Sequence, residues 1–138
     1  MWKGIVAGLM VAYLALLIDL TLFRYQVGHA DRNLVPFRTI RHDFRAGGEE
    51  FRVNILGNLA AFAPLGLLAP VLLGRRASAG RIASGSLAFS LFIESVQGFT
   101  GHRVADVDDL ILNTLGGLIG YGIWRGGRRL FRLRDSSS

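Results

Sequence analysis

The segment FIESVQGFTGHRVADVDDLILNTLGGLIGYG, residues 92–122, decides the fold. It places a group of ionisable and amide side chains between two strongly apolar runs, residues 82–99 and 110–124. Such runs are typical of membrane-spanning helices, and a charged group near the apolar part of a bilayer is costly, so it points to a function. The group comprises Glu94, Gln97, Arg103, Asp106, Asp108, Asp109 and Asn113. We therefore expect a polar site at a membrane boundary.

Composition supports a membrane protein. The 138-residue chain is 51% hydrophobic and 19% charged, and its apolar residues gather in long runs separated by clusters of Arg and Asp. Its net charge of +6 comes from basic residues that flank these runs, as expected for membrane orientation and contact with anionic lipid. No basic motif with interleaved aromatic residues suggests nucleic-acid binding. The chain has no Cys, which excludes disulfides and thiolate sites.

The apolar runs predict an all-α integral membrane protein. We expect one domain, residues 1–138, with four transmembrane helices at about residues 4–23, 54–73, 82–99 and 107–124 and a basic tail at residues 125–138. A cleaved signal peptide is the alternative for the first run, but its length and Asp19 favour a retained helix. Pro64 should kink the second helix. Asp residues at the start of the fourth helix should cap its free N–H groups.

A long polar connection, residues 25–52, joins the first two helices. Connections of this length are commonly functional or disordered. Asn33, Pro36 and Phe37 lie in a short segment that predicts a fixed turn docked on the membrane surface or between helices. We expect the connection to fold over the polar end of the bundle.

With four spans, the first and third connections lie on the same side of the membrane. The polar residues of the helix ends beside them then fall in one leaflet: Asp19, Asn54, Asn58, Glu94, Gln97, Asp108, Asp109 and Asn113. Basic residues in the short loop at 74–81 and in the tail favour cytoplasmic termini in an inner membrane, although the first connection is also rich in Arg. The polar site should therefore face outward.

Several of these residues form a pattern that resembles the VanZ-like family of small bacterial membrane proteins. The matching motifs are Asn33-Leu-x-Pro-Phe37, Asn54-x-x-x-Asn58-x-x-x-Phe62-x-Pro64-x-Gly66, Glu94-x-x-Gln97 and Arg103-x-x-Asp106-x-x-Asp109-x-x-x-Asn113-x-x-Gly116. The resemblance implies a multi-pass protein of the cytoplasmic membrane. It also implies a connection with the cell envelope, because the family is named after an accessory protein of glycopeptide-antibiotic resistance. It supplies no reaction.

The first functional hypothesis is a site that binds or acts on an envelope lipid or a lipid-linked glycan. Glu94 is a candidate general base, Asp109 a second catalytic candidate, and Arg103 a candidate for gripping a phosphate or carboxylate. The candidate ligand-binding residues are Asn54, Asn58, Gln97, Asp106 and Asn113. Asp106, Asp109 and Asn113 share a helical face that Asp108 does not. Asp106 and Asp109 could hold a divalent cation, but no His or further acid lies in register, so we predict no metal site. The sequence names no cofactor.

The competing interpretation is that these residues only hold the bundle together, through a Glu94–Arg103 pair and amide bonds from Asn58 to Gln97 or Asn113. A non-enzymatic accessory protein that binds a membrane partner is the alternative function, and a transporter is a third. Glycine-rich helix faces, including Gly4, Gly8, Gly116 and Gly120, could support a homo-oligomer. Loss of function with normal insertion in Glu94 or Asp109 variants would favour an enzyme, and loss of accumulation would favour a structural role.

Overall fold

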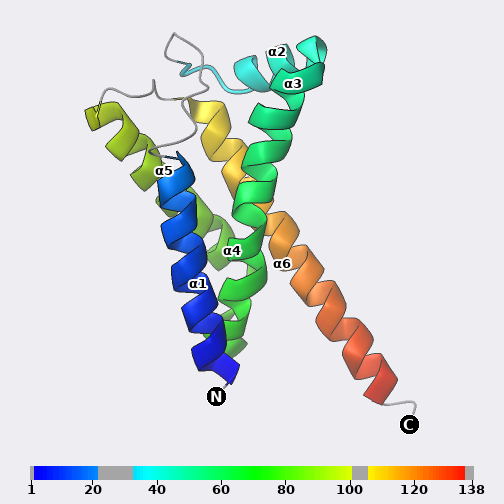
Figure 1. Ribbon diagram of the computed structural model, residues 1–138. Coiled ribbons are helices and arrows are strands. Elements are labelled where there is room, and N and C mark those ends of the chain that lie inside the picture. The colour runs from blue at the N-terminus through cyan, green and yellow to red at the C-terminus, as the bar shows by residue number, and fades with distance from the viewer. Residues whose placement is uncertain (1, 22–32, 101–105, 136–138) are drawn as a thin grey trace.

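The computed structural model describes residues 2–21, 33–100 and 106–135 of the chain. Long helices lie side by side in this part of the protein, and two short helices cross one end of them (Figure 1). The long helices are α1 (Trp2–Asp19), α4 (Gly57–Leu73), α5 (Ala79–Thr100) and α6 (Val107–Asp135). The short ones are α2 (Arg38–Ala46) and α3 (Gly48–Glu50). The predicted all-α fold is confirmed.

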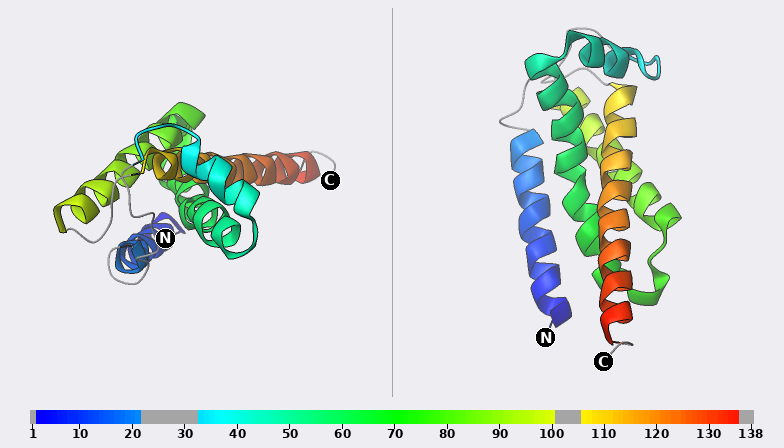
Figure 2. Two further views of the ribbon diagram at one scale, coloured as in Figure 1. Left: turned by 90° about the horizontal axis from the view of Figure 1, so that it is seen from above. Right: turned by 90° about the vertical axis from the view of Figure 1, so that its right-hand side faces the viewer.

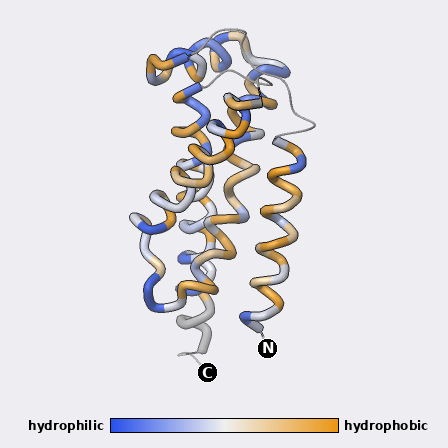
Figure 3. The backbone as a smooth tube through the Cα atoms, turned by 90° about the vertical axis from the view of Figure 1, so that its left-hand side faces the viewer, coloured by the Kyte–Doolittle hydropathy of each residue, from blue (hydrophilic) through white to orange (hydrophobic). Residues whose placement is uncertain are grey.

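Three helical stretches are long and apolar enough to cross a membrane. They are Trp2–Asp19, Gly48–Arg76 and Ala79–Phe99. The second is an unbroken stretch in which α3, a π-helical turn (Phe51–Leu56), α4 and a 3-10 turn (Gly74–Arg76) follow one another. Apolar residues dominate the middle of the bundle, whereas polar residues gather at its ends (Figure 3). These helices mark the chain as a membrane protein.

The packed core is small, as expected when lipid rather than water surrounds the helices. Leu17, Phe62 and Ile93 form its buried centre and so join α1, α4 and α5. Many large apolar side chains point outward instead, for example Leu9 of α1 and Leu115 of α6, which are 55% and 45% exposed. In a bilayer such side chains contact acyl chains, so their exposure carries no cost.

Helix α6 is longer than predicted. The sequence interpretation ended the fourth helix near Trp124 and gave residues 125–138 to a basic tail, but α6 continues to Asp135. The segment after Trp124 is rich in Arg and Leu, which are good helix formers, and it contains no proline. The predicted boundary was wrong because it equated the helix with its apolar portion.

Glycines bring α6 against its neighbours. A Cβ atom at Gly116 or Gly120 would meet the carbonyl oxygen of Leu59 or Ala63, and one at Gly66 would meet that of Gly117. The backbones of α4 and α6 therefore touch directly, as small residues allow in membrane helices. Most of the glycine face of α6 is thus used inside the chain, whereas Gly4 and Gly8 of α1 have open space beside them. The homo-oligomer stays a prediction.

Both prolines of α4 lie inside the helix without ending it. Pro64 removes one helical hydrogen bond and crowds the turn before it. Tyr13 of α1 supplies a donor to this turn, because its hydroxyl donates to the carbonyl oxygen of Ala61 at 2.5 Å. Neighbouring side chains commonly stabilise proline-containing membrane helices in this way. The kink at Pro64 stays a prediction.

The first connection contains ordered structure that the sequence interpretation lacked. A turn at residues 33–37 leads into α2, which lies across the end of the bundle near the start of α6 (Figure 2). The turn and its position over the polar end are confirmed. The segment 45–48 joins α2 to α3 through Gly47 and Gly48, both with positive φ. Residues 22–32 lie outside the described part.

Candidate functional site

Asp108 holds the start of α2. Its carboxylate accepts hydrogen bonds from the backbone N–H of Phe37 at 2.5 Å and of Ile40 at 3.0 Å. Phe37 precedes α2 in a left-handed conformation, with φ of 65°, and its side chain offers no cap. Asp108, a residue of α6, therefore caps the N-terminus of α2, and its negative charge lies at the positive end of the α2 dipole.

Asp106 fixes the turn that precedes α2. One of its oxygens accepts from the amide of Asn33 at 2.8 Å, and the other accepts from the hydroxyl of Thr39 at 2.7 Å. The first oxygen also accepts from the backbone N–H of Asp108, so Asp106 caps α6 as predicted. Val107 donates its N–H to the carbonyl of Asn33, which joins the two segments by a short bridge. Both oxygens of Asp106 thus serve the fold, which argues against the cation site considered for Asp106 and Asp109.

A second pair of contacts joins the connection to the start of the second spanning stretch. Asn54, in the π-helical turn, donates to Asp43 of α2 at 3.0 Å, and Asp43 is only 1% exposed. His42 lies 3.2 Å from the same carboxylate and 3.9 Å from that of Glu50. His42, Asp43 and Glu50 form the group of possible metal ligands in the described part of the chain, with ligand atoms within 4.8 Å of one another. His42 and Glu50 are exposed, so nothing encloses an ion there.

Asn58 and Asp109 form the contact between α4 and α6 at the polar end. The amide of Asn58 donates to the carboxylate of Asp109 at 2.8 Å and to the carbonyl of Asn54 one turn earlier at 2.7 Å. Asp109 is buried, whereas Asn58 is partly exposed. The predicted hydrogen bonds from the amide of Asn58 to Gln97 or Asn113 were wrong, because the amide nitrogen of Asn58 donates to the carboxylate of Asp109 instead. A carboxylate is the stronger acceptor.

Gln97 and Asn113 bind elsewhere. Gln97 donates from α5 to the carbonyl of Thr21 at 2.8 Å and so ties α5 to the end of the first helix. Asn113 donates from α6 to the hydroxyl of Ser90 on α5 at 2.8 Å. Both amides are buried, and each joins two helices. Asn113 therefore belongs to the packing of α5 on α6 rather than to the cluster around Asp109.

The three catalytic candidates are only partly described. Glu94 reaches the backbone N–H of Asp106 from 3.4 Å, a long hydrogen bond that places it beside the start of α6. Asp109 contacts Asn58 as above, and Arg103 lies outside the described residues. The predicted pair between Glu94 and Arg103 lies outside them as well. The catalytic roles stay predictions.

A groove opens beside this cluster, between the end of α1 and the start of the second spanning stretch. We call it the α1–α4 groove, and its volume is about 450 Å³. Its walls are mostly apolar, from residues such as Leu17, Leu20 and Ala61, but its lining also includes Thr21, Arg52, Asn54 and Asn58. Asn58 therefore faces the groove while its amide contacts Asp109. An apolar channel with a few polar groups at one end is typical of a site for an amphipathic ligand.

The sequence interpretation missed several members of the polar end. Asp108 was set aside because it leaves the face of Asp106 and Asp109, yet it is fully buried under the first connection. Asp43 and Thr39 are also buried, and nothing in their local sequence separates them from exposed charged neighbours. The motif around Asn33 and Pro36 was the available signal, because a fixed turn needs a partner to dock on.

Asn33, Asn58, Asp106, Asp108 and Asp109 form the group of polar side chains that we call the acid–amide cluster. The helices and this cluster define a small helical membrane protein in which α2 covers one end of the bundle (Figure 2). The family model described as VanZ/LLP1 matches residues 10–132, nearly the whole chain. The protein belongs to this VanZ-like family, as its motifs predicted. No curated protein and no solved structure matches the chain.

Proposed function

We propose that this protein binds an envelope lipid or a lipid-linked glycan, with the ligand's chain in the α1–α4 groove and its polar head beside Asn58 and Asp109. The observation that carries the proposal is the double role of Asn58, which lines the groove and contacts a buried carboxylate. A ligand in the groove would thus meet a polarised amide rather than a bare apolar wall. The apolar walls suit an acyl or isoprenoid chain.

The mouth of the groove adds a charge of the right sign for a phosphate-bearing head. Arg52 lines it and is exposed, and its Nε donates to the carbonyl of Gly48 within its own helical stretch. A guanidinium group can bind a phosphate through two parallel hydrogen bonds. Asn54 and Thr21, on the walls, offer neutral donors and acceptors to sugar or peptide groups.

The alternative is that the polar residues only hold the bundle together, as a non-enzymatic accessory protein would require. Asp106 and Asp108 favour this for their own part of the cluster, because the backbone and side chains of the first connection occupy their oxygens. The groove and the half-exposed Asn58 favour a ligand for the remainder. We therefore propose binding, and we leave catalysis by Glu94, Asp109 and Arg103 as a prediction.

The proposal includes a topology. Helix α6 packs against α4 and α5 and extends over the height of the bundle, with its C-terminal end leaning away from them (Figure 2). Its length and position support a fourth crossing. Four crossings in the cytoplasmic membrane would return the chain to its starting side. The basic turn at Gly74–Arg76 and the basic end of α6 favour cytoplasmic termini and an outward-facing polar end. A role in glycopeptide resistance belongs to the same proposal and would be measured as altered teicoplanin susceptibility in a deletion strain.

Photo-crosslinking in intact cells tests the bound ligand. A benzophenone amino acid replaces Ala60, an exposed residue that lines the groove, or, as the control, Leu115, an exposed residue of α6 outside it. After irradiation, mass spectrometry should find a discrete lipid or lipid-linked glycan at position 60 and bulk phospholipid at position 115. Asn58→Leu should abolish the discrete product. The same bulk phospholipids at both positions would contradict the proposal.

A further inference from the structure

The end of the bundle opposite the acid–amide cluster carries a different kind of site. A cleft of about 720 Å³ lies between the turn after α4 and the later part of α6. We call it the basic cleft, and its lining includes Arg75, Tyr121, Trp124, Arg125, Arg128 and Arg129. None of its lining residues is acidic. Of the chain's ten acidic residues, only Asp135 lies in the part of the sequence that forms this end.

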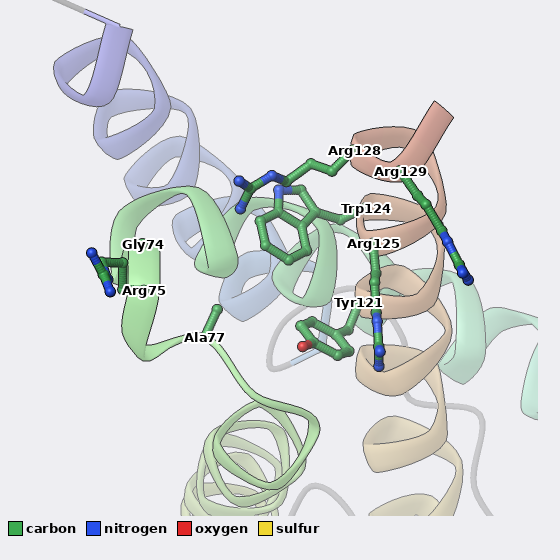
Figure 4. A pocket seen from close by; sticks show the side chains of 8 residues that line it. All are labelled: Gly74, Arg75, Ala77, Tyr121, Trp124, Arg125, Arg128 and Arg129. Carbon is green, nitrogen blue, oxygen red and sulfur yellow. The ribbon is translucent and has the colours of Figure 1, made fainter. Parts of the chain in front are cut away.

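The aromatic residues of the cleft hold one arginine in place. Tyr121 and Trp124 stack with ring centroids 5.7 Å apart, and the guanidinium carbon of Arg128 lies 5.0 Å from the centroid of the Trp124 ring. Figure 4 shows the three side chains one above another along α6, with Arg128 extending over the indole towards the turn after α4. A cation placed over an aromatic face is attracted by it and keeps its hydrogen-bond donors available.

The arginines of the cleft have no carboxylate partner among the described residues, where the ion pairs found involve only His42. Arg125 lies three residues before Arg128, on the adjacent part of the same helical face, and Figure 4 shows both beside Tyr121 and Trp124. Arg75 and Arg129 point away from the indole and lie at the rim. The cleft therefore has the guanidinium group of Arg128 over the indole and that of Arg125 beside Tyr121, with no acidic side chain among its lining residues.

We propose that the basic cleft binds the headgroup phosphate of an anionic phospholipid from the adjacent leaflet. Tyr121 and Trp124 are residue types that settle at the level of lipid headgroups, where a phosphate would meet Arg125 and Arg128. Guanidinium groups bind phosphate through paired hydrogen bonds, and basic pockets between membrane helices suit anionic headgroups. The inference concerns the opposite end of the bundle from the α1–α4 groove and does not depend on it.

Fluorescence quenching by brominated lipid tests the site directly. The chain has two tryptophans, so Trp2→Phe leaves Trp124 as the only reporter. The full-length variant is reconstituted in bilayers that mix phosphatidylcholine with phosphatidylglycerol, one or the other carrying bromines close to the glycerol. Quenching should show at least about a fivefold preference of Trp124 for phosphatidylglycerol. A preference near one would overturn the proposal.

Charge-matched variants distinguish a specific binding site from nonspecific electrostatic attraction between the protein and anionic lipid. In the Trp2→Phe background, Arg125→Gln with Arg128→Gln should remove the preference, whereas Arg41→Gln with Arg45→Gln on α2 should retain it. Arg125→Lys with Arg128→Lys keeps the charge but loses the paired donors, so most of the preference should be lost. Full retention in either Arg125/Arg128 pair, or equal loss in the α2 pair, would overturn the proposal. Circular dichroism checks that each variant is folded.

Inorganic phosphate distinguishes the lipid from a free anion. Added to the reconstituted protein at an ionic strength matched with chloride, it should leave quenching by brominated phosphatidylglycerol unchanged. Displacement of the lipid by phosphate alone would assign the cleft to a free anion and overturn the lipid proposal.

Discussion

Asp108 has no exposed surface, yet it carries the contacts that keep α2 over the bundle. A buried carboxylate is tolerated when hydrogen-bond donors surround it. Here the two closest donors are backbone N–H groups, which cannot rotate away, and the amide of Asn33 donates from 3.4 Å. Position 108 therefore needs a side chain with two acceptor oxygen atoms, and an ionised carboxylate supplies them.

We predict that Asp108→Asn detaches α2. The amide keeps the shape of the carboxylate but turns one acceptor into a donor that faces the N–H of Phe37 or Ile40. A buried donor left without an acceptor costs about 1–3 kcal/mol of unfolding free energy. Trypsin should then cut faster at the exposed Arg41 and Arg45 of α2. Glu49→Gln removes the same charge from an exposed position and should leave the cleavage rate as it was; an equal rate in both variants would contradict the prediction.

At the scale of elements, the crossing of α4 and α6 depends on missing side chains. Gly66 faces the backbone of α6, and Gly116 and Gly120 face that of α4. A bulky residue at Gly116 or Gly120 would therefore disturb the fold itself, so its effect could not be assigned to a contact with a partner. Glycines with open space beside them, such as Gly4 and Gly8 of α1, are better candidates for association between chains.

We predict that Gly120→Ala destabilises the protein while Gly122→Ala does not. A methyl group at position 120 collides with the carbonyl of Ala63, and such overpacking typically costs about 1–3 kcal/mol. Position 122 is on the same helix, and nothing lies within 4 Å of a Cβ atom there. The unfolding free energy in mixed micelles should fall for the first variant and stay equal or rise for the second. Equal values would mean that the helices separate easily at this crossing.

The sequence predicted elements better than their ends. Apolar runs located α1, α4 and α5 because a bilayer imposes their length. The sequence did not predict α2, because this helix is polar and is held by Asp108 from a distant part of the chain. The convergence of Asn54, Asn58 and Asp109 followed from the number of crossings alone. The hydrogen-bond partners of these residues could not be predicted in the same way, because each pairing depends on how the first connection docks on the bundle.

At the scale of the whole molecule, charge is divided between two ends. The acid–amide cluster and α2 lie at one end, and the basic cleft, the start of α1 and the end of α6 lie at the other (Figure 1). A cation-rich end whose sequence contains a single acid, Asp135, favours the cytoplasmic side of a membrane. In the proposed topology, the α1–α4 groove lies on the opposite, outward side.

We predict that single cysteines report this division, since the natural chain has none. Cysteine at Arg45 should react with a membrane-impermeant reagent in intact cells, whereas cysteines at Ala79 and Gly126 should react only after lysis. Arg45 is a better probe position than the nearby Gly48, because the φ of Gly48 is +60° and a side chain there is strained. Labelling of Ala79 and Gly126 from outside would invert the topology. Labelling of those two positions from different sides would refute the fourth crossing.

The contacts of Asp106 and Asp108 with the first connection also order events during synthesis. They join residues 67 to 75 positions apart, so α2 leaves the ribosome long before the carboxylates that hold it. Until α6 has been made and inserted, the N–H groups of Phe37 and Ile40 lack the carboxylate that accepts from them in the folded protein. Closure of the polar end is thus a final step that only a completed bundle can take, and a cell that degrades unclosed chains would thereby remove those whose last helix failed to insert.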